Sequence, residues 1–313
     1  MVLSPTIKND INMAKTILIT GATGMIGGHL IREIAARGDK YIAVTTNPEA
    51  AQKKLKNVCR VVGINDILSL RNEKIDAMIN LAGANLGSKR WTEAAKKEFY
   101  DSRMDVTNSL VKLIAEMEIK PEVLISTSGV DYYGNTGSKD MYEDAPPADS
   151  YLGRLTNDWE QAALKAETIG VRTVIFRTGF VMAADSEAVK KLLMPVKLFV
   201  GGPLGSGKQY MSWIHINDLI ALYMFAIDNG NLQGIYNASA PNPQTNALFT
   251  KHAAKLLKRP AFMPVPSFVI KAVLGEMSTV VLDGRRAMPK KIIDSGFRFK
   301  FENDTDAWKD ILV

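Results

Sequence analysis

A strand-like run followed directly by three spaced glycines constrains this chain more than any other stretch. Residues 17–19 are apolar and rich in β-branched side chains, and Gly21, Gly24 and Gly27 follow in the order G-x-x-G-x-x-G, ahead of a helical pattern. Gly21 suits a tight turn, Gly24 a close approach of a pyrophosphate, and Gly27 close packing of the helix on the strand. The flanking strand and helix supply the context that this fingerprint requires. We therefore expect a dinucleotide at the helix N-terminus, bound by Gly21, Thr23, Gly24, Met25, Ile26 and Gly27.

Strand-like and helical patterns then alternate along the first half of the chain. Strands are predicted over residues 41–45, 58–64, 75–82, 122–128 and 172–177, and helices over 25–37, 48–56, 91–118 and 154–168. This alternation predicts an α/β fold, a Rossmann-type doubly wound parallel sheet with ligands at the carboxyl ends of the strands.

Glycine and proline become frequent beyond about residue 179, and two helical segments (247–257 and 267–274) stand apart. We expect a cofactor-binding domain over residues 15–178, with returning segments up to about 240. Residues 179–313 would mostly form a smaller C-terminal subdomain on the substrate side. Residues 1–14 would be a loose leader.

Composition excludes several classes of site and partner. Cys59 is the only cysteine, and His29, His215 and His252 are far apart, so a disulfide framework and a metal site are not expected. A net charge of +6 with interspersed signs suits an anionic cofactor or substrate better than nucleic acid. The chain shows no signal-type segment and no apolar run of about 18 residues. We therefore expect a cytoplasmic protein without a membrane partner.

The end of the second predicted strand bears on the choice of dinucleotide. NAD sites commonly place a carboxylate there to bind the ribose 2′-hydroxyl. Here Thr45, Thr46 and Asn47 are neutral, and Lys53 or Lys54 could reach a 2′-phosphate. These residues favour NADP(H) over NAD(H). No arginine is present there to bind the phosphate, so NAD(H) is still an alternative cofactor. A further alternative is that these residues form only a polar loop that caps the next helix.

Four motifs together resemble the extended and atypical short-chain dehydrogenase/reductases: ITGATGMIGGHL, INLAGANL (79–86), STSGVDYYG (126–134) and MSWIHINDL (211–219). KRWTEAAKKEFYDSR, GGPLGSGKQYMSWIHINDL and the C-terminal PVPSFVIKAVLGEM narrow the resemblance to the NAD-dependent epimerase family, in its nucleoside-diphosphate-sugar epimerase subgroup with a separate C-terminal domain. The resemblance implies a Rossmann fold and a nicotinamide cofactor. It further implies cofactor contacts from Leu81, Ala82, Gly83, Ser126, Arg177, Thr178 and Gly179.

The catalytic set of that superfamily is incomplete here. A tyrosine with a pKa near 10 needs a nearby cation to act as an acid/base, which the superfamily supplies as a lysine four residues later. Ser128 and Tyr151 match the catalytic serine and tyrosine, but Leu155 replaces the lysine. Hydride chemistry of the usual kind is therefore in doubt, and Tyr132 or Tyr133 are alternative acid/base groups.

Three residues are candidates for substrate contact: Arg103, Tyr133 and Lys208. Arg103 stands where the superfamily has an asparagine, and its alternative is a surface arginine paired with Asp101 or Asp105. Lys208 ends a glycine-rich loop whose sequence nearly matches the P-loop motif, but a strand-like run follows it instead of a helix. A surface turn is its alternative.

Other polar residues are given structural roles. We expect His215 to be buried and satisfied, Asp218 to cap a helix, and the basic cluster of Arg285, Arg286, Lys290 and Lys291 to be mainly solvated.

Two functional hypotheses follow. The first is an NADP(H)-dependent oxidoreductase or epimerase that acts on a small substrate, and a nucleotide-linked compound is one candidate for that substrate. The second is a catalytically impaired NADP(H)-binding regulatory or interaction protein, for which the resemblance allows a link to cell division. The sequence leaves open the substrate, the turnover, and the choice between monomer and homodimer.

Overall fold

A seven-stranded, fully parallel sheet forms the centre of the protein. The computed structural model describes residues 14–313, so the expected leader lies outside the described residues except for its last one. The strand order is β11-β7-β5-β4-β1-β2-β3, which confirms the predicted Rossmann-type sheet. Its strands are β1 (Thr16–Thr20), β2 (Lys40–Thr45), β3 (Arg60–Gly63), β4 (Ala77–Asn80), β5 (Val123–Gly129), β7 (Arg172–Thr178) and β11 (Gly234–Ala238).

Helices cover both faces of this sheet because its strands are apolar on both sides. α1 (Met25–Ala36) and α6 (Ile216–Asp228) pack on the face that contains Ile17 and Ile19. α3 (Glu93–Glu116) packs on the face that contains Leu18, and α4 (Tyr151–Leu164) lies beside it. The short α2 (Pro48–Lys54) follows β2.

A second hydrophobic core organises most of the chain beyond the sheet. Trp213, Phe249 and Trp308 are its largest buried members. The helices α5 (Glu187–Lys197), α7 (Asn246–Leu256) and α11 (Asp304–Leu312) contribute to this core. The remaining helices are α8 (Ser267–Leu274), α9 (Thr279–Leu282) and α10 (Lys290–Asp294). The short strands are β6 (Asp140–Met141), β8 (Phe180–Met182), β9 (Tyr210–Met211), β10 (Trp213–His215), β12 (Gln244–Thr245) and β13 (Arg286–Ala287).

The starts of α4 and α6 differ from the sequence predictions, and the capping side chain explains each difference. α4 begins at Tyr151 rather than at 154, since the Ser150 hydroxyl accepts a hydrogen bond from the Gly153 amide. α6 begins at Ile216, capped by the His215 side chain. The prediction that Asp218 is the cap was wrong: its carboxylate accepts the backbone amides of Lys300 (2.8 Å) and Phe301 (2.9 Å).

Two further observations hold for residues 14–313. None of the helices there combines the length and the apolar character needed to cross a bilayer. In the same residues, no three histidine, cysteine or acidic side chains gather as a metal site would require, and Cys59 is a free, exposed thiol.

Candidate cofactor and active site

The glycine turn between β1 and α1 is packed too closely for side chains at two of its glycines. Gly21 has a φ of +70°, and a Cβ there would lie 2.8 Å from the carbonyl oxygen of Leu81. A Cβ on Gly27 would lie 2.4 Å from the Gly21 carbonyl oxygen, so a larger residue would push α1 off the turn. Gly24, the N-cap of α1, offers no side chain to the first amides of the helix. These amides and the positive helix end fit the pyrophosphate of a dinucleotide. The other predicted contacts of this turn are half-buried: Thr23, Met25 and Ile26.

Lys54 joins the end of the second βα unit to this turn. Its ammonium donates a hydrogen bond to the Thr23 carbonyl oxygen at 2.6 Å. At the end of β2, Thr45 is half-buried and Thr46 is exposed, while the Asn47 side chain caps α2. The end of β2 is therefore neutral, and a cation lies at the glycine turn beside it.

Thr20 fixes the chain that follows β4 against β1. Its hydroxyl donates to Asn80 Oδ1 at 2.7 Å and accepts the amides of Leu81 (3.1 Å) and Ala82 (3.2 Å). Asn80 Nδ2 also donates to the Ser126 hydroxyl at 3.3 Å. Ser126 is fully buried, so its hydroxyl belongs to this core network.

Arg103 is a buried cation that lies against the Gly83 backbone. A Cβ on Gly83 would meet the Arg103 guanidinium carbon at 3.0 Å. The guanidinium donates to the carbonyl oxygens of Phe99 (2.9 Å) and Ala84 (3.3 Å) and lies 5.1 Å from the ring centroid of Trp159. Only 8% of Arg103 is exposed, so the alternative of a surface arginine does not hold.

The charge of Arg103 has no carboxylate partner within hydrogen-bonding distance in residues 14–313, and Asp101 pairs with Lys97 instead. Burial lowers the pKa of Arg103 to about 10, and the charges of Tyr151 and Asp131 oppose this change. A buried cation without a counter-ion is costly, and an anionic ligand would offset that cost.

Tyr151 begins α4, and its hydroxyl faces α3. It donates to the Lys96 carbonyl oxygen at 2.8 Å, and its ring meets Trp91 edge-on at 5.5 Å. Burial raises the pKa of Tyr151, while the charges of Arg103 and Lys96 oppose the rise. Leu155, one turn later, is buried and offers no cation. Tyr151 also lines a surface hollow of about 430 Å³ together with Glu93, Lys96, Lys97, Tyr100, Arg154 and Glu276.

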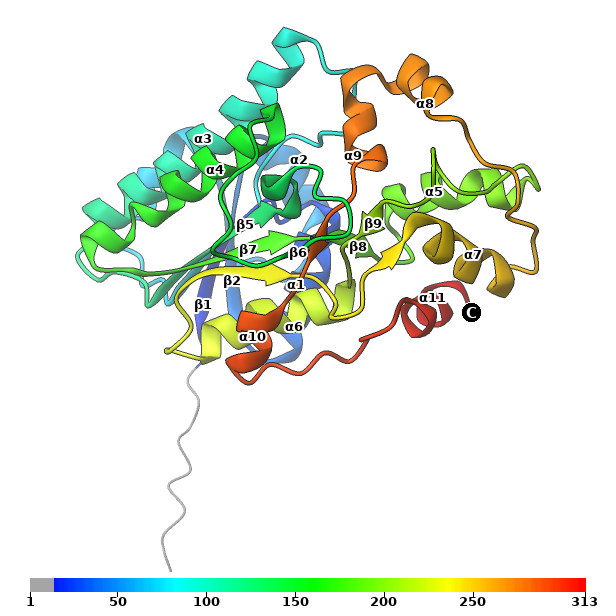
Figure 1. Ribbon diagram of the computed structural model, residues 1–313. Helices are drawn as coiled ribbons and strands as arrows, with labels where there is room; N and C mark the ends of the chain where they lie inside the picture. Colours follow the sequence, from blue (N-terminus) through cyan, green and yellow to red (C-terminus); the bar gives the residue numbers. More distant parts are fainter. Residues whose placement is uncertain (1–13) are drawn as a thin grey trace, which may run out of the picture.

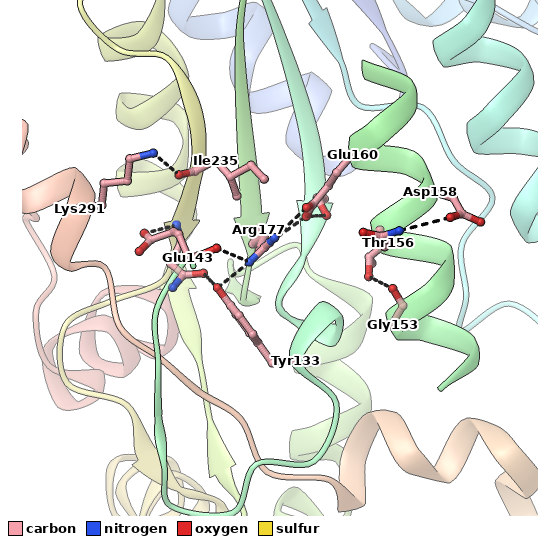
Figure 2. Close-up of polar contacts among 12 residues, drawn as sticks. Tyr133, Glu143, Gly153, Thr156, Asp158, Glu160, Arg177, Ile235 and Lys291 are labelled. Carbon is pink, nitrogen blue, oxygen red and sulfur yellow. Dashed lines mark hydrogen bonds and ion pairs between the residues drawn. The ribbon is translucent and has the colours of Figure 1, made fainter. Parts of the chain in front are cut away.

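Ser128 belongs to a buried network around Glu160 and Arg177, and Figure 2 shows the contact between these two residues. Its hydroxyl donates to Glu160 Oε1 at 2.7 Å. Arg177 Nε and Nη2 donate hydrogen bonds to the two carboxylate oxygens of Glu160, each at 2.8 Å. Burial alone would lower the pKa of Arg177, but the hydrogen bonds and charge of Glu160 outweigh it and raise that pKa. The Arg177 side chain is therefore structural, which leaves its backbone for a cofactor contact.

Tyr133 is part of the same network. Its hydroxyl donates to Asn237 Oδ1 at 2.7 Å and accepts from Arg177 Nη1 at 3.0 Å. Burial raises the pKa of Tyr133 to about 12, although Arg177 lowers it in part. The Arg177 guanidinium also stacks on Tyr132, with its carbon 3.4 Å from the centroid of that ring. Both tyrosines are buried and serve packing more than proton transfer.

The last predicted contacts lie at the edges of this region. Thr178 Oγ1 is 3.3 Å from Thr127 Oγ1, and a Cβ on Gly179 would lie 2.7 Å from the Ser212 carbonyl oxygen. Lys208 is exposed and precedes β9, so its loop is not a P-loop.

An ion pair that the sequence did not reveal lies just beyond β5. Asp131, two residues after Gly129, contacts Arg285 Nη2 at 2.9 Å. Arg285 is 7% exposed, so the prediction of a solvated residue was wrong for it. The segment around Arg285 is held by the Ser212 hydroxyl, which donates to the Arg285 carbonyl oxygen. The C-terminal region is thus tied to the strand end that carries Ser128.

Glu160 was also missed, although α4 carries a signal for it. Leu152, Leu155, Thr156 and Trp159 mark the buried face of the helix, and Glu160 falls on the same face. A carboxylate on such a face predicts a buried cation as its partner.

The comparisons with known proteins agree with this geometry. A model described as the NAD dependent epimerase/dehydratase family matches residues 17–239, and a domain of unknown function matches residues 265–311. An epimerase family protein of Staphylococcus epidermidis is 38% identical over 304 residues, covering 95% of this chain and 99% of its own. The human epimerase family protein SDR39U1, solved with NADPH, matches with a TM-score of 0.86 and 31% identity, over 95% of this chain and 98% of that one. The nucleoside-diphosphate sugar epimerase from Corynebacterium glutamicum matches with a TM-score of 0.73 and 26% identity, over 94% of this chain and 57% of that one.

Proposed function

Because this chain belongs to the NAD dependent epimerase/dehydratase family, we propose that it is an NADP(H)-dependent oxidoreductase or epimerase that acts on a small, nucleotide-linked substrate. The observation that carries the proposal is the glycine turn with Lys54 beside it, a cradle for a pyrophosphate next to a cation for a 2′-phosphate. The human relative with NADPH supports the same cofactor.

Both backbone groups and side chains would contact the cofactor. The amides after Gly21 and Gly24 hold the pyrophosphate, and the Lys54 ammonium holds the 2′-phosphate. The backbones of residues 81–83 and 177–179 would line the rest of the cofactor. A bound nicotinamide supplies hydride transfer.

We assign the substrate-binding residues from their charge. Arg103 is the main anion contact, because its buried charge lacks a counter-ion, and Lys208 is a second, exposed contact. The similarity to the nucleoside-diphosphate sugar epimerase from Corynebacterium glutamicum supports a nucleotide-linked, and so anionic, substrate. Ser128 would orient a substrate hydroxyl or carbonyl, with Glu160 holding the serine in place.

Tyr151 is the proposed acid/base, and Arg103 replaces the missing lysine as its cation. Each of the two groups favours the charged form of the other. For this role the Tyr151 hydroxyl must leave the Lys96 carbonyl oxygen when substrate binds.

A second function is favoured by that same contact. The bond of the Tyr151 hydroxyl to α3 and the burial of Leu155 support a protein that binds NADP(H) without turnover. Such a protein would act as a cofactor-dependent regulator. The cell-division link, the cytoplasmic location and the choice between monomer and homodimer stay predictions from the sequence.

Turnover across a panel of sugar nucleotides and small carbonyl compounds tests the enzyme proposal. An oxidoreductase changes the reduced-nicotinamide absorbance, whereas an epimerase returns the hydride and is detected by chromatography of its sugar product. Turnover that Ser128→Ala abolishes, with NADPH affinity retained, is the expected result. Tight NADPH binding with no turnover of any compound would favour the regulatory function.

A further inference from the structure

One face of the C-terminal subdomain exposes many apolar side chains. It is formed by the end of α5, the loop after it, and the connection from α7 to α8 (Figure 1). Phe262 is 73% exposed and Leu198 is 64% exposed. We call this surface the basic apolar patch; its apolar members are Met194, Leu198, Phe199, Val200, Phe262 and Met263.

The two loops of the patch lie side by side. Arg259, from the α7–α8 connection, lies over Phe199 with its guanidinium carbon 4.3 Å from the ring centroid. Farther along, the Met263 amide donates to the Gly201 carbonyl oxygen at 3.4 Å and the Val265 amide to that of Pro203 at 2.9 Å. The exposed apolar residues therefore form one continuous surface.

The backbone holds two patch residues in a conformation that side chains rarely adopt. Phe199 has a φ of +64° and Lys258 a φ of +54°. A left-handed conformation is unfavourable for a bulky residue such as phenylalanine. The fold thus keeps an aromatic side chain exposed at a conformational cost, which is unexpected for a surface with no role.

The two chain segments that form the patch carry charges of a single sign. Residues 188–217 and 229–275 contain no aspartate or glutamate. The exposed cations of α5, of α7 and of the connection after α7 are Lys191, Lys197, Lys251, Lys255, Lys258 and Arg259. Within residues 14–313 none of them forms an ion pair, whereas Lys190 pairs with Glu187.

We propose that the basic apolar patch binds the surface of an anionic phospholipid membrane. Exposed aromatic and aliphatic side chains insert at the level of the head groups, and lysines around them attract anionic lipids. A second copy of the chain is disfavoured as the occupant, because a twofold contact through this patch would bring like charges together. The proposal differs from the sequence-based expectation of no membrane partner, which considered only spanning segments.

Co-sedimentation with lipid vesicles tests the proposal on the full chain. One set of vesicles contains phosphatidylcholine alone, and the other contains equal parts of phosphatidylcholine and phosphatidylglycerol. We expect binding only to the second set, weakened by added salt. Lys197→Glu should weaken binding about fivefold or more, and Phe262→Ser should also weaken it. Ile119→Ser, an exposed apolar residue on the loop after α3, is the matched control and should bind as the wild type does.

Three results would overturn the proposal. The first is an absence of binding to anionic vesicles by wild-type protein that is folded and binds NADPH. The second is equal loss of binding in the Ile119 control. The third is a dimer, detected by analytical ultracentrifugation, that Phe262→Ser dissociates, since the patch would then be a contact between two copies.

Discussion

The Lys54 ammonium lies 2.6 Å from the carbonyl oxygen of Thr23, so that the end of α2 is hydrogen-bonded to the glycine turn. This contact brings a cation from the second βα unit to the dinucleotide cradle of the first. This contact is the basis on which we propose a preference for NADP(H) over NAD(H).

Replacing Lys54 with methionine should weaken NADPH binding much more than NADH binding. A charge-assisted hydrogen bond contributes about 1.5 to 3 kcal/mol, so the dissociation constant for NADPH should rise by about 10- to 100-fold. Fluorescence titration of both nucleotides measures the effect. Lys53→Met, the adjacent exposed lysine, is the control, and equal losses for the two nucleotides would show that Lys54 does not contact the 2′-phosphate.

Replacing Arg103 with methionine should separate stability from ligand binding. The ligand-free protein should be as stable as the wild type or more stable, because a buried cation without a partner is removed. The gain in melting temperature on adding NADPH or a sugar nucleotide should shrink. Differential scanning fluorimetry with each ligand separately identifies which one meets Arg103. A variant that is less stable without ligand but gains the full wild-type shift would contradict an anion-binding role.

Breaking the Glu160–Arg177 pair should destabilise the protein strongly. Both side chains are almost fully buried, and removing one partner of such a pair costs about 3 to 5 kcal/mol. Urea denaturation of Glu160→Gln measures the free energy of unfolding. Glu187→Gln, which removes an exposed ion pair, should leave it unchanged. A Glu160 variant as stable as the wild type would show that the network is not needed for the fold.

The fold could be predicted from the sequence more fully than the site. The glycine turn, the β2 segment and the exact bounds of α8 followed from local patterns, because backbone geometry and amphipathic periodicity act over a few residues. The Asp131–Arg285 pair joins residues far apart in the chain, and the sequence gives no spacing rule for it. The direction of the Tyr151 hydroxyl depends on α3, another distant element.

Installing the missing lysine should not raise turnover, because Arg103 is the proposed cation for Tyr151. Leu155 is buried, so Leu155→Lys would place a charge in an apolar position and lower the melting temperature. The substrate panel measured with this variant and with Leu155→Met as a control tests the expectation. Turnover gained only in the lysine variant would mean that the lysine alone was missing.

The stability of the protein should fall as the pH drops below about 6.5, in part because of His215. Burial lowers the pKa of His215 below 6.5, although Asp310 opposes the change. The unfolded chain then binds a proton at a higher pH than the folded chain does, so stability is lost as the pH falls from 6.5 towards the folded pKa. His215→Asn, which keeps a capping side chain before α6, should flatten this part of a urea-denaturation profile against pH. An unchanged slope would assign the pH dependence to other groups.

Isothermal titration of the wild-type protein with NADPH and with NADH, in the same buffer, tests the central claim most directly. We expect one site per chain, with NADPH bound at least about tenfold more tightly than NADH, a difference of about 1.4 kcal/mol. Equal affinities, tighter binding of NADH, or binding of neither nucleotide would contradict the account of the glycine turn and Lys54 as an NADP(H) site.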